Sequence, residues 1–207
     1  MPETETKIEK IIKGNYFMYL FFDTETTGLP RNYQAPLDDF LNWPRIVQIA
    51  WSLYDAAGNH WESQNYIIRP DGFVIPPEVT KIHRISQERA LKEGVALRPA
   101  LEHFLRDVGA ASFLVAHNID FDEKIVGAEL CREKLANPVT AANKICTMKT
   151  SVSFCKIPSS RGGYKWPNLT ELYTCLFKTA FPEAHDASFD VKACAECFFE
   201  LKRRGAI

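Results

Sequence analysis

The sequence has no long apolar run and no strong excess of charge of either sign. No segment approaches the length needed to span a membrane, and the polar N-terminus, MPETETKIEK, lacks the apolar stretch of a secretory signal. The 25 basic and 26 acidic residues nearly cancel, which excludes a broad positive field that attracts nucleic acid. A nucleic acid would therefore be held by a local patch or through metal ions.

The sequence also has only one paired cysteine motif. Six cysteines are scattered along the chain, and only Cys194 and Cys197 form a C-x-x-C pair. Without a secretory signal we expect reduced thiols and a cytoplasmic location. The residues around Cys194 follow a helical period, so we interpret these cysteines as buried helix residues. A structural zinc site is the less favoured alternative.

The length and composition predict one globular domain. The chain has 207 residues, of which 46% are hydrophobic, enough to bury a large core. We expect a single domain over 1–207, in which residues 1–13 form a loose polar lead-in. No repeat, linker or second domain is visible.

The chain is organised around residues 16–28, YFMYLFFDTETTG. A continuous apolar run of this kind predicts a strand that is buried on both faces and central in its sheet. Asp23 and Glu25 follow at positions i and i+2, so they project to the same side of the extended chain. A divalent cation between them would offset their repulsion. The alternative is a strand that ends at the surface with two solvated acids.

The rest of the pattern predicts an α/β domain with a mixed sheet. After Gly28 we expect a long loop with one helical turn around 37–41. Alternating strands over 45–55 and 60–69, joined by turn residues 57–59, predict a β-hairpin. In the 45–55 strand, Val47, Ile49, Trp51 and Leu53 should share one face. Further strands are predicted at 112–116 and 144–148. Helices are predicted at 86–94, from Pro99 to Gly109, at 119–135, from Asn168 onward and at 186–204. Asn168 has the spacing of a capping box to Glu171.

More acids open two of the predicted helices. Asp122 and Asp190 each fall in a first helical turn, where acids compensate the helix dipole. That explanation suffices for either residue alone, and we apply it to Asp120, Glu123 and Asp186. The set is different, because in an open α/β sheet a strand end and several helix starts converge on one crevice. Four converging carboxylates would hold two Mg²⁺ or Mn²⁺ ions.

Three motifs, DTETTG at 23–28, HN-x-x-FD at 117–122 and H-x(4)-D at 185–190, give the chain its family resemblance. In this order and spacing they resemble the motifs of the DEDDh, or DnaQ-like, 3′–5′ exonucleases, which include the DNA polymerase III epsilon subunit and ribonuclease T. The resemblance implies a ribonuclease H-like fold with a mixed five-stranded sheet flanked by helices. It also implies His185 as general base, because Asp186 stands where another branch has Tyr. The implied metal ligands are Asp23, Glu25, Asp122 and Asp190.

The implied activity is metal-dependent hydrolysis of the terminal phosphodiester. Two divalent cations, Mg²⁺ or Mn²⁺, would activate the attacking water, and His185 would accept its proton near neutral pH. The expected substrates are single-stranded 3′ ends of DNA or RNA, and the expected products are nucleoside 5′-monophosphates. A polymerase or another replication or repair protein is the expected partner. The alternative is a non-catalytic nucleic-acid-binding module on the same fold.

Weaker expectations concern substrate contacts. We expect Thr24, Thr26 and Gly28 to contact the terminal nucleotide, because the loop after the strand approaches the site. The resemblance places His83 beside the terminal sugar or phosphate, and a packed histidine is the alternative.

Two further segments have open interpretations. His117 and Asn118 are expected to shape the entry of the next helix, with Asn118 as its N-cap. Residues 161–166, RGGYKW, combine cations, aromatics and glycines, which favours a nucleic-acid contact. The alternative is that Trp166 packs on the following helix.

Overall fold

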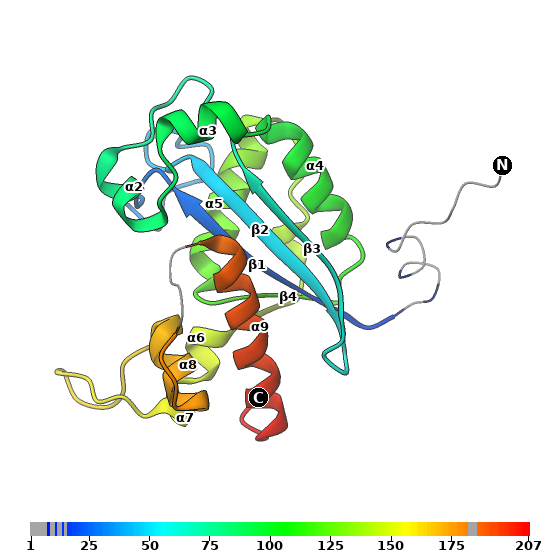
Figure 1. The fold of residues 1–207 in the computed structure, drawn as a ribbon, viewed down its shortest axis with the longest axis vertical. Coiled ribbons are helices and arrows are strands. Elements are labelled where there is room, and N and C mark those ends of the chain that lie inside the picture. Colours follow the sequence, from blue (N-terminus) through cyan, green and yellow to red (C-terminus); the bar gives the residue numbers. More distant parts are fainter. Residues whose placement is uncertain (1–7, 9–10, 12–13, 15, 182–185) are drawn as a thin grey trace.

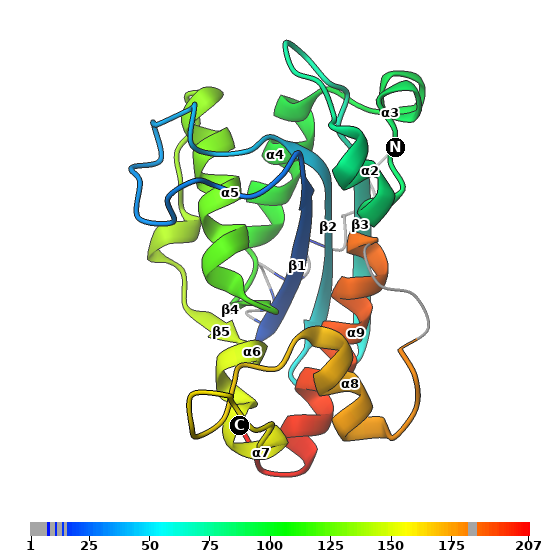
Figure 2. The same ribbon diagram turned by 90° about the vertical axis from the view of Figure 1, so that its left-hand side faces the viewer.

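The fold is built on a five-stranded sheet whose central strand is β1 (Met18–Thr26). The structure is a computed structural model that describes residues 8, 11, 14, 16–181 and 186–207. The strand order is β3-β2-β1-β4-β5 (Figures 1 and 2). The prediction of a central strand ending in two acids is therefore confirmed.

The sheet is mixed, as the sequence predicts. Strands β2 (Ile46–Asp55) and β3 (His60–Ile67) form an antiparallel hairpin, and β2 also pairs antiparallel with β1. Strands β4 (Phe113–Ala116) and β5 (Lys144–Cys146) continue the sheet in parallel on the other side of β1. Because parallel strands need crossover connections, helices precede β4 and β5 in the chain.

Helices cover both faces of the sheet (Figure 2). Helices α4 and α5 lie on one face and α9 on the other (Figure 2). Helices α2 and α3 lie near the end of the hairpin that is opposite its turn (Figure 1). Their bounds are α2 Pro77–His83, α3 Gln87–Glu93, α4 Leu97–Val108, α5 Ile119–Arg132, α6 Thr147–Thr150, α7 Val152–Cys155, α8 Leu169–Phe177 and α9 Ala187–Arg203, with a 3₁₀ turn η1 at Val139–Ala141.

Strand β1 contributes alternate side chains to two cores. Leu20 and Phe22 join the larger cluster with residues of α4 and α5, whereas Tyr19 and Phe21 pack against α9. The two faces follow from the period of two along a strand. Asp23 and Glu25 continue the α9 face, so the alternation that builds the core also aims both acids at that helix.

A β-bulge changes the predicted facing of β2. Glu25 pairs with Gln48 but Thr26 pairs with Ile46, so Val47 is an extra residue in β2. Val47 therefore leaves the face it was predicted to share with Ile49 and packs in a separate cluster with α3.

Other differences from the prediction have local causes. Helix α5 ends at Arg132 instead of 135, because Lys134 adopts a left-handed φ of 55° and the N–H of Leu135 bonds back to the carbonyl of Leu130 at 2.9 Å. Pro99 is the third residue of α4 instead of the first. The first-turn N–H groups have no partner inside a helix, so proline is tolerated there too.

The segment between β1 and β2 forms turns instead of the expected helical turn. The Arg132 side chain donates to the carbonyls of Phe40 and Trp43, at 3.0 and 2.7 Å, and so replaces helical N–H donors. In the lead-in, Ile8 and Ile11 are buried in the larger core cluster, so the expectation of a wholly loose segment is wrong for these two residues.

The remaining predicted boundaries are close to those observed. Ser86 caps α3, Gly94 ends it, and Asn168 with Glu171 forms the capping box of α8. Helix α9 begins one residue after its cap, Asp186. Among the residues that the structure describes, no helix is both long enough and apolar enough to cross a membrane.

Candidate active site

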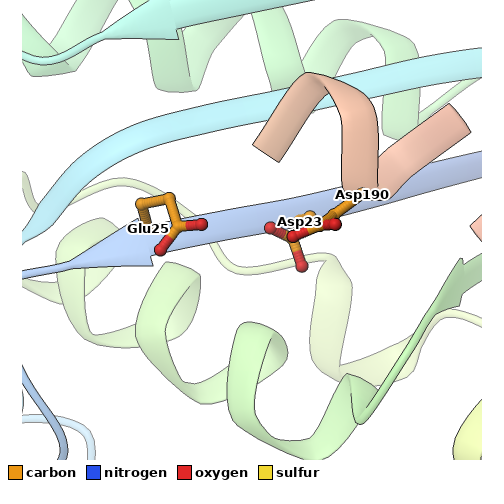
Figure 3. A group of neighbouring side chains, drawn as sticks. All are labelled: Asp23, Glu25 and Asp190. Carbon is orange, nitrogen blue, oxygen red and sulfur yellow. The ribbon is translucent and has the colours of Figure 1, made fainter. Parts of the chain in front are cut away.

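Three carboxylates meet between β1 and the start of α9. Asp23 and Glu25 extend from β1, and Asp190 reaches them from the first turn of α9 (Figure 3). One oxygen of each lies within 4.8 Å of the other two. Carboxylate oxygens at this spacing are the donors that Mg²⁺ and Mn²⁺ prefer, so the residues fit a divalent cation.

The start of α9 is fixed to the sheet by Gln48, a buried residue of β2 directly opposite Glu25. Its Oε1 accepts from the backbone N–H of Ala187 at 3.2 Å, and its Nε2 lies 3.4 Å from Asp186 Oδ1. Asp186 caps the helix by accepting from the N–H of Ser188 at 2.9 Å. These contacts set the position of Asp190, one turn further along the helix.

Asp122 approaches from the other side of β1. It lies in the first turn of α5 and is 2% exposed. Its Oδ1 accepts from the backbone N–H of Thr24 at 3.1 Å and from the Thr24 hydroxyl at 2.7 Å. Asp122 is therefore joined to the strand residue that separates Asp23 from Glu25.

The four acids share one electrostatic environment. Burial raises the pKa of Asp23 well above its usual range, and the charges of Asp122, Asp190 and Glu25 add to that rise. Burial, followed by the charges of Asp190 and Asp122, raises the pKa of Glu25 to about 8. The arrangement is costly as four bare anions, and a bound cation would remove the cost.

Asp122 shows the same competition in a milder form. Burial raises its pKa to about 7, although both hydrogen bonds from Thr24 act in the opposite direction. The charge of Asp190 raises it further, which links the α5 side of the cluster to the α9 side. The structure thus brings Asp23, Glu25 and Asp190 together within 4.8 Å, and the charge of Asp122 acts on Asp23 and Glu25 from outside that group.

His185, the expected general base, lies outside the described residues. The segment that follows it is Asp186 and α9, which carries Asp190.

The residues expected to contact substrate have clear positions. The Thr24 hydroxyl bonds to Asp122, and the Thr26 hydroxyl donates to the carbonyl of Gly28 at 2.6 Å. Gly28 has a φ of 152°, a conformation open mainly to glycine. His83 is buried at the end of α2, where its Nδ1 accepts from the N–H of Ile85 at 3.1 Å, in agreement with the packed-histidine alternative.

His117 organises the entry of α5. Its Nε2 donates to the carbonyl of Pro167 and its Nδ1 accepts from the Thr147 hydroxyl, both at 3.0 Å. Burial lowers the pKa of His117 to about 4, so the ring is neutral near pH 7. Asn118 occupies the N-cap position with a left-handed φ of 74°, but its side chain makes no cap bond to α5, contrary to expectation.

The C-x-x-C pair lies in the interior of the molecule. Cys194 and Cys197 are buried on α9 against other helices and the sheet. In the described part of the chain, the only group of three or more metal-ligating side chains is that of Asp23, Glu25 and Asp190. The interpretation of Cys194 and Cys197 as buried helix residues is confirmed.

The role of Gln48 was not predicted, although a lone amide between Val47 and Ile49 is a visible signal in the sequence. A buried amide inside an apolar strand needs partners, and here those partners belong to the helix that carries Asp190.

Comparison with known proteins decides the family. The model of the RNase_T exonuclease family matches residues 20–198, which include all three motifs. The chain belongs to this exonuclease family. Its DnaQ-like resemblance is confirmed by a relative from Treponema pallidum, named DNA polymerase III subunit epsilon, which is 28% identical over 180 residues, or 86% of this chain and 73% of that protein.

Solved structures of exonuclease I have the same fold. The Escherichia coli enzyme in complex with a dA16 oligonucleotide matches 90% of this chain with a TM-score of 0.70 and 18% identity. The enzyme from Methylocaldum szegediense matches 91% with a TM-score of 0.70 and 17% identity. This chain spans about 41% of each of those proteins.

These findings confirm the predicted class of fold and enzyme. The ribonuclease H-like arrangement, a mixed sheet flanked by helices, is shared with the exonuclease I structures. Family membership makes the chain a nuclease of the hydrolase class and implies the use of divalent metal ions. The carboxylate cluster is the place in the described structure that suits such ions.

Proposed function

We propose that this chain is a metal-dependent 3′–5′ exonuclease that releases nucleoside 5′-monophosphates from single-stranded DNA or RNA. The observation that carries the proposal is the convergence of Asp23, Glu25 and Asp190 within 4.8 Å. The exonuclease family supplies the reaction class, and the cluster supplies a site at which that reaction can occur.

Four carboxylates hold the cofactor in this proposal. Asp23, Glu25, Asp122 and Asp190 are the ligands of two divalent cations, Mg²⁺ or Mn²⁺. When bound, such ions would supply positive charge to the attacking and leaving oxygens of an in-line displacement. The chain contributes the convergence of the acids, the hydrogen bonds that fix Asp122, and the anchored start of α9.

His185 is proposed to accept the proton of the attacking water. An imidazole near its ordinary pKa is half protonated close to neutral pH, so it can take up and release a proton there. Support comes from the sequence, in which His185 precedes Asp190 by five residues, as in the H-x(4)-D motif. Thr24, Thr26, Gly28 and His83 remain proposed contacts of the terminal nucleotide.

Single-stranded 3′ ends are the proposed substrates. Structures of exonuclease I in complex with dA16 and dT13 oligonucleotides support this, because they share the fold of this chain. DNA and RNA both stay within the proposal. The name of the Treponema relative, a polymerase III subunit, supports a polymerase or another replication or repair protein as the partner.

A non-catalytic nucleic-acid-binding module is the rival function. A binding module has no need of metal ligands, and such ligands would be lost from it. All four acids and His185 are present in this sequence, which favours the enzyme.

The test follows 5′-labelled single-stranded DNA and RNA oligonucleotides with Mg²⁺ or Mn²⁺, and with EDTA as the metal-free control. The expected result is a ladder that shortens from the 3′ end, requires metal and is abolished by Asp23→Asn. His185→Ala should slow the reaction by 10²-fold or more, about the contribution of a general base. His60→Ala, which alters an exposed histidine on the hairpin, is the matched control and should leave the rate unchanged. Binding of the oligonucleotides without any shortening would support the rival module.

A further inference from the structure

A second recess lies beside the start of α5, outside the acid cluster. It has a volume of about 580 Å³ and is lined by four separate segments of the chain. Tyr33 comes from the loop after β1, Phe121 from α5 and Met148 from α6, and Trp166 precedes α8. We call it the aromatic pocket.

Two of the three aromatic rings of this pocket are exposed to solvent. Trp166 is 62% exposed and Tyr33 is 45% exposed. The Tyr33 and Phe121 rings lie 6.5 Å apart between centroids, with an interplanar angle of 49°. Exposed apolar side chains that form one contiguous surface, instead of lying singly, mark ligand-binding grooves and interaction sites. A flat aromatic ligand would suit their faces.

Charge around the pocket permits a phosphate backbone. The two acids of the rim are paired, Asp120 with Lys149 and Glu123 with Lys144, the second pair at 2.8 Å. Lys124 also lines the pocket. Three lysines therefore face two carboxylates, a local balance of 3 − 2 = +1 that contrasts with the four acids of the candidate active site.

The pocket is joined to the candidate active site by short structural links. Phe121 directly precedes Asp122 on α5. Trp166 directly precedes Pro167, whose carbonyl accepts from His117 at 3.0 Å. Asn168 and Glu171 then form the capping box of α8, so the backbone that carries Trp166 is held at two successive points. The aromatic pocket therefore adjoins the turn of α5 that carries Asp122.

We propose that the aromatic pocket stacks unpaired nucleobases of the substrate strand on the 5′ side of the cleaved bond. This inference rests on the proposed function, because it assumes that the 3′ nucleotide occupies the acid cluster. Every base has a π-face, so stacking on Trp166 and Tyr33 would bind single strands with little preference for sequence. Paired bases have their faces covered by neighbours, so the pocket would favour single strands over duplexes.

The structure divides residues 161–166 into parts with different roles. Trp166 lines the pocket, whereas Tyr164 does not, although it is 52% exposed. Lys165 forms an ion pair with Glu171 at 2.6 Å. Tyr164 is therefore a matched control for Trp166, since it is an aromatic residue of similar exposure only two positions away.

The experiment measures binding of a labelled single-stranded oligonucleotide by fluorescence anisotropy in EDTA, so that no cleavage is required. Trp166→Ala should weaken binding about tenfold, within the usual range for loss of one stacked base. Trp166→Phe should restore most of the affinity, and Tyr164→Ala should leave it unchanged. Single abasic residues, moved stepwise from the 3′ end, should reproduce the loss at one or two positions. Trp166→Ala should cause no further loss with those abasic strands.

The outcomes separate this inference from the proposed function. If Trp166→Ala binds the oligonucleotide as tightly as the unmodified chain, the stacking site is wrong, whatever the catalytic result. An equal tenfold loss with abasic strands and with the duplex of the same sequence would also overturn it, because phosphate contact would then explain the effect. If stacking is observed but no strand is shortened with Mg²⁺ or Mn²⁺, the proposed exonuclease activity fails and the binding site stands.

Discussion

At the scale of single residues, Thr24 favours the ionised form of Asp122. Its N–H and its hydroxyl both donate to Asp122 Oδ1, and both bonds lower the pKa of a carboxyl that burial raises to about 7. A carboxylate must be ionised to hold a cation. Thr24 thus keeps Asp122 available as a ligand near neutral pH.

Thr24→Val should remove the hydroxyl with little change in shape. We expect the pKa of Asp122 to rise, the pH dependence of the nuclease rate to move to higher pH, and kcat/KM at pH 7 to fall about tenfold, the scale of one hydrogen bond to a charged group. Thr24→Ser retains the hydroxyl and should restore the rate. A Thr24→Val enzyme with an unchanged pH–rate profile would show that the bond has no influence on the site.

Residues next to one another in sequence were the easiest part of the site to predict. The spacing of Asp23 and Glu25 alone places both on one face of a strand. The bond from Thr24 to Asp122 spans 98 positions, and that from Ala187 to Gln48 spans 139. Only the packed structure shows such pairs. The family motifs named the acids, but they did not reveal what holds the acids in place.

At the scale of elements, the site depends on how α9 is docked to the sheet. Gln48 is 2% exposed, and its amide also donates to Asn65 Oδ1 at 2.9 Å, which connects β3 to the same anchor. One side chain of β2 therefore joins two strands to the start of α9. A displaced helix start would move Asp190 away from Asp23 and Glu25.

Gln48→Met keeps the volume of the side chain and removes its hydrogen bonds. We expect about 1–3 kcal/mol less stability, because buried partners lose their bonds. We also expect a higher metal concentration for half-maximal activity, with kcat reduced more than KM is raised. Ser52→Ala, which alters another polar residue of the same strand, is the control. It should lower the stability without changing the metal requirement. Lower stability with an unchanged metal requirement would make Gln48 a purely structural residue.

The elements themselves were predicted largely from periodicity and caps, and the misses share a cause. Ser86, Gly94 and the Asn168–Glu171 box are local signals, and the structure confirms each of them. The bulge at Val47 depends on pairing with β1, and the burial of Ile8 and Ile11 depends on a distant core. Neither is encoded in a short window of sequence.

At the scale of the whole molecule, the layers of the fold converge on a concentration of negative charge. The sheet supplies Asp23 and Glu25, one helix layer supplies Asp122 and the other supplies Asp190. The core that buries these acids also raises their pKa values. The stability of the entire domain should therefore depend on pH and on divalent cations together.

The sign of this dependence follows from linkage. Folding raises the pKa of Glu25 from 4.5 to about 8 and that of Asp122 from 3.8 to about 7. Between its two pKa values, each carboxyl is protonated more fully in the folded chain than in the unfolded chain. Without metal, the free energy of unfolding should fall as pH rises from about 4 to about 8. Ions that bind only the folded chain should reverse the loss.

Thermal unfolding in EDTA at pH 5.5 and at pH 8 tests this. We expect Tm to be lower at pH 8 by at least about 3 °C, which corresponds to roughly 1 kcal/mol in a chain of this size. Millimolar Mg²⁺ or Mn²⁺ should raise Tm at pH 8 more than at pH 5.5, because protons compete with the ions for the same oxygens. Glu25→Gln should flatten the pH dependence in EDTA, whereas Glu88→Gln, which alters an exposed acid of α3, should not. A Tm in EDTA that is higher at pH 8 would show that burial and mutual repulsion of these carboxylates do not govern the stability. A metal effect that survives Asp23→Asn with Asp190→Asn would show that these two carboxylates are not the principal cation site.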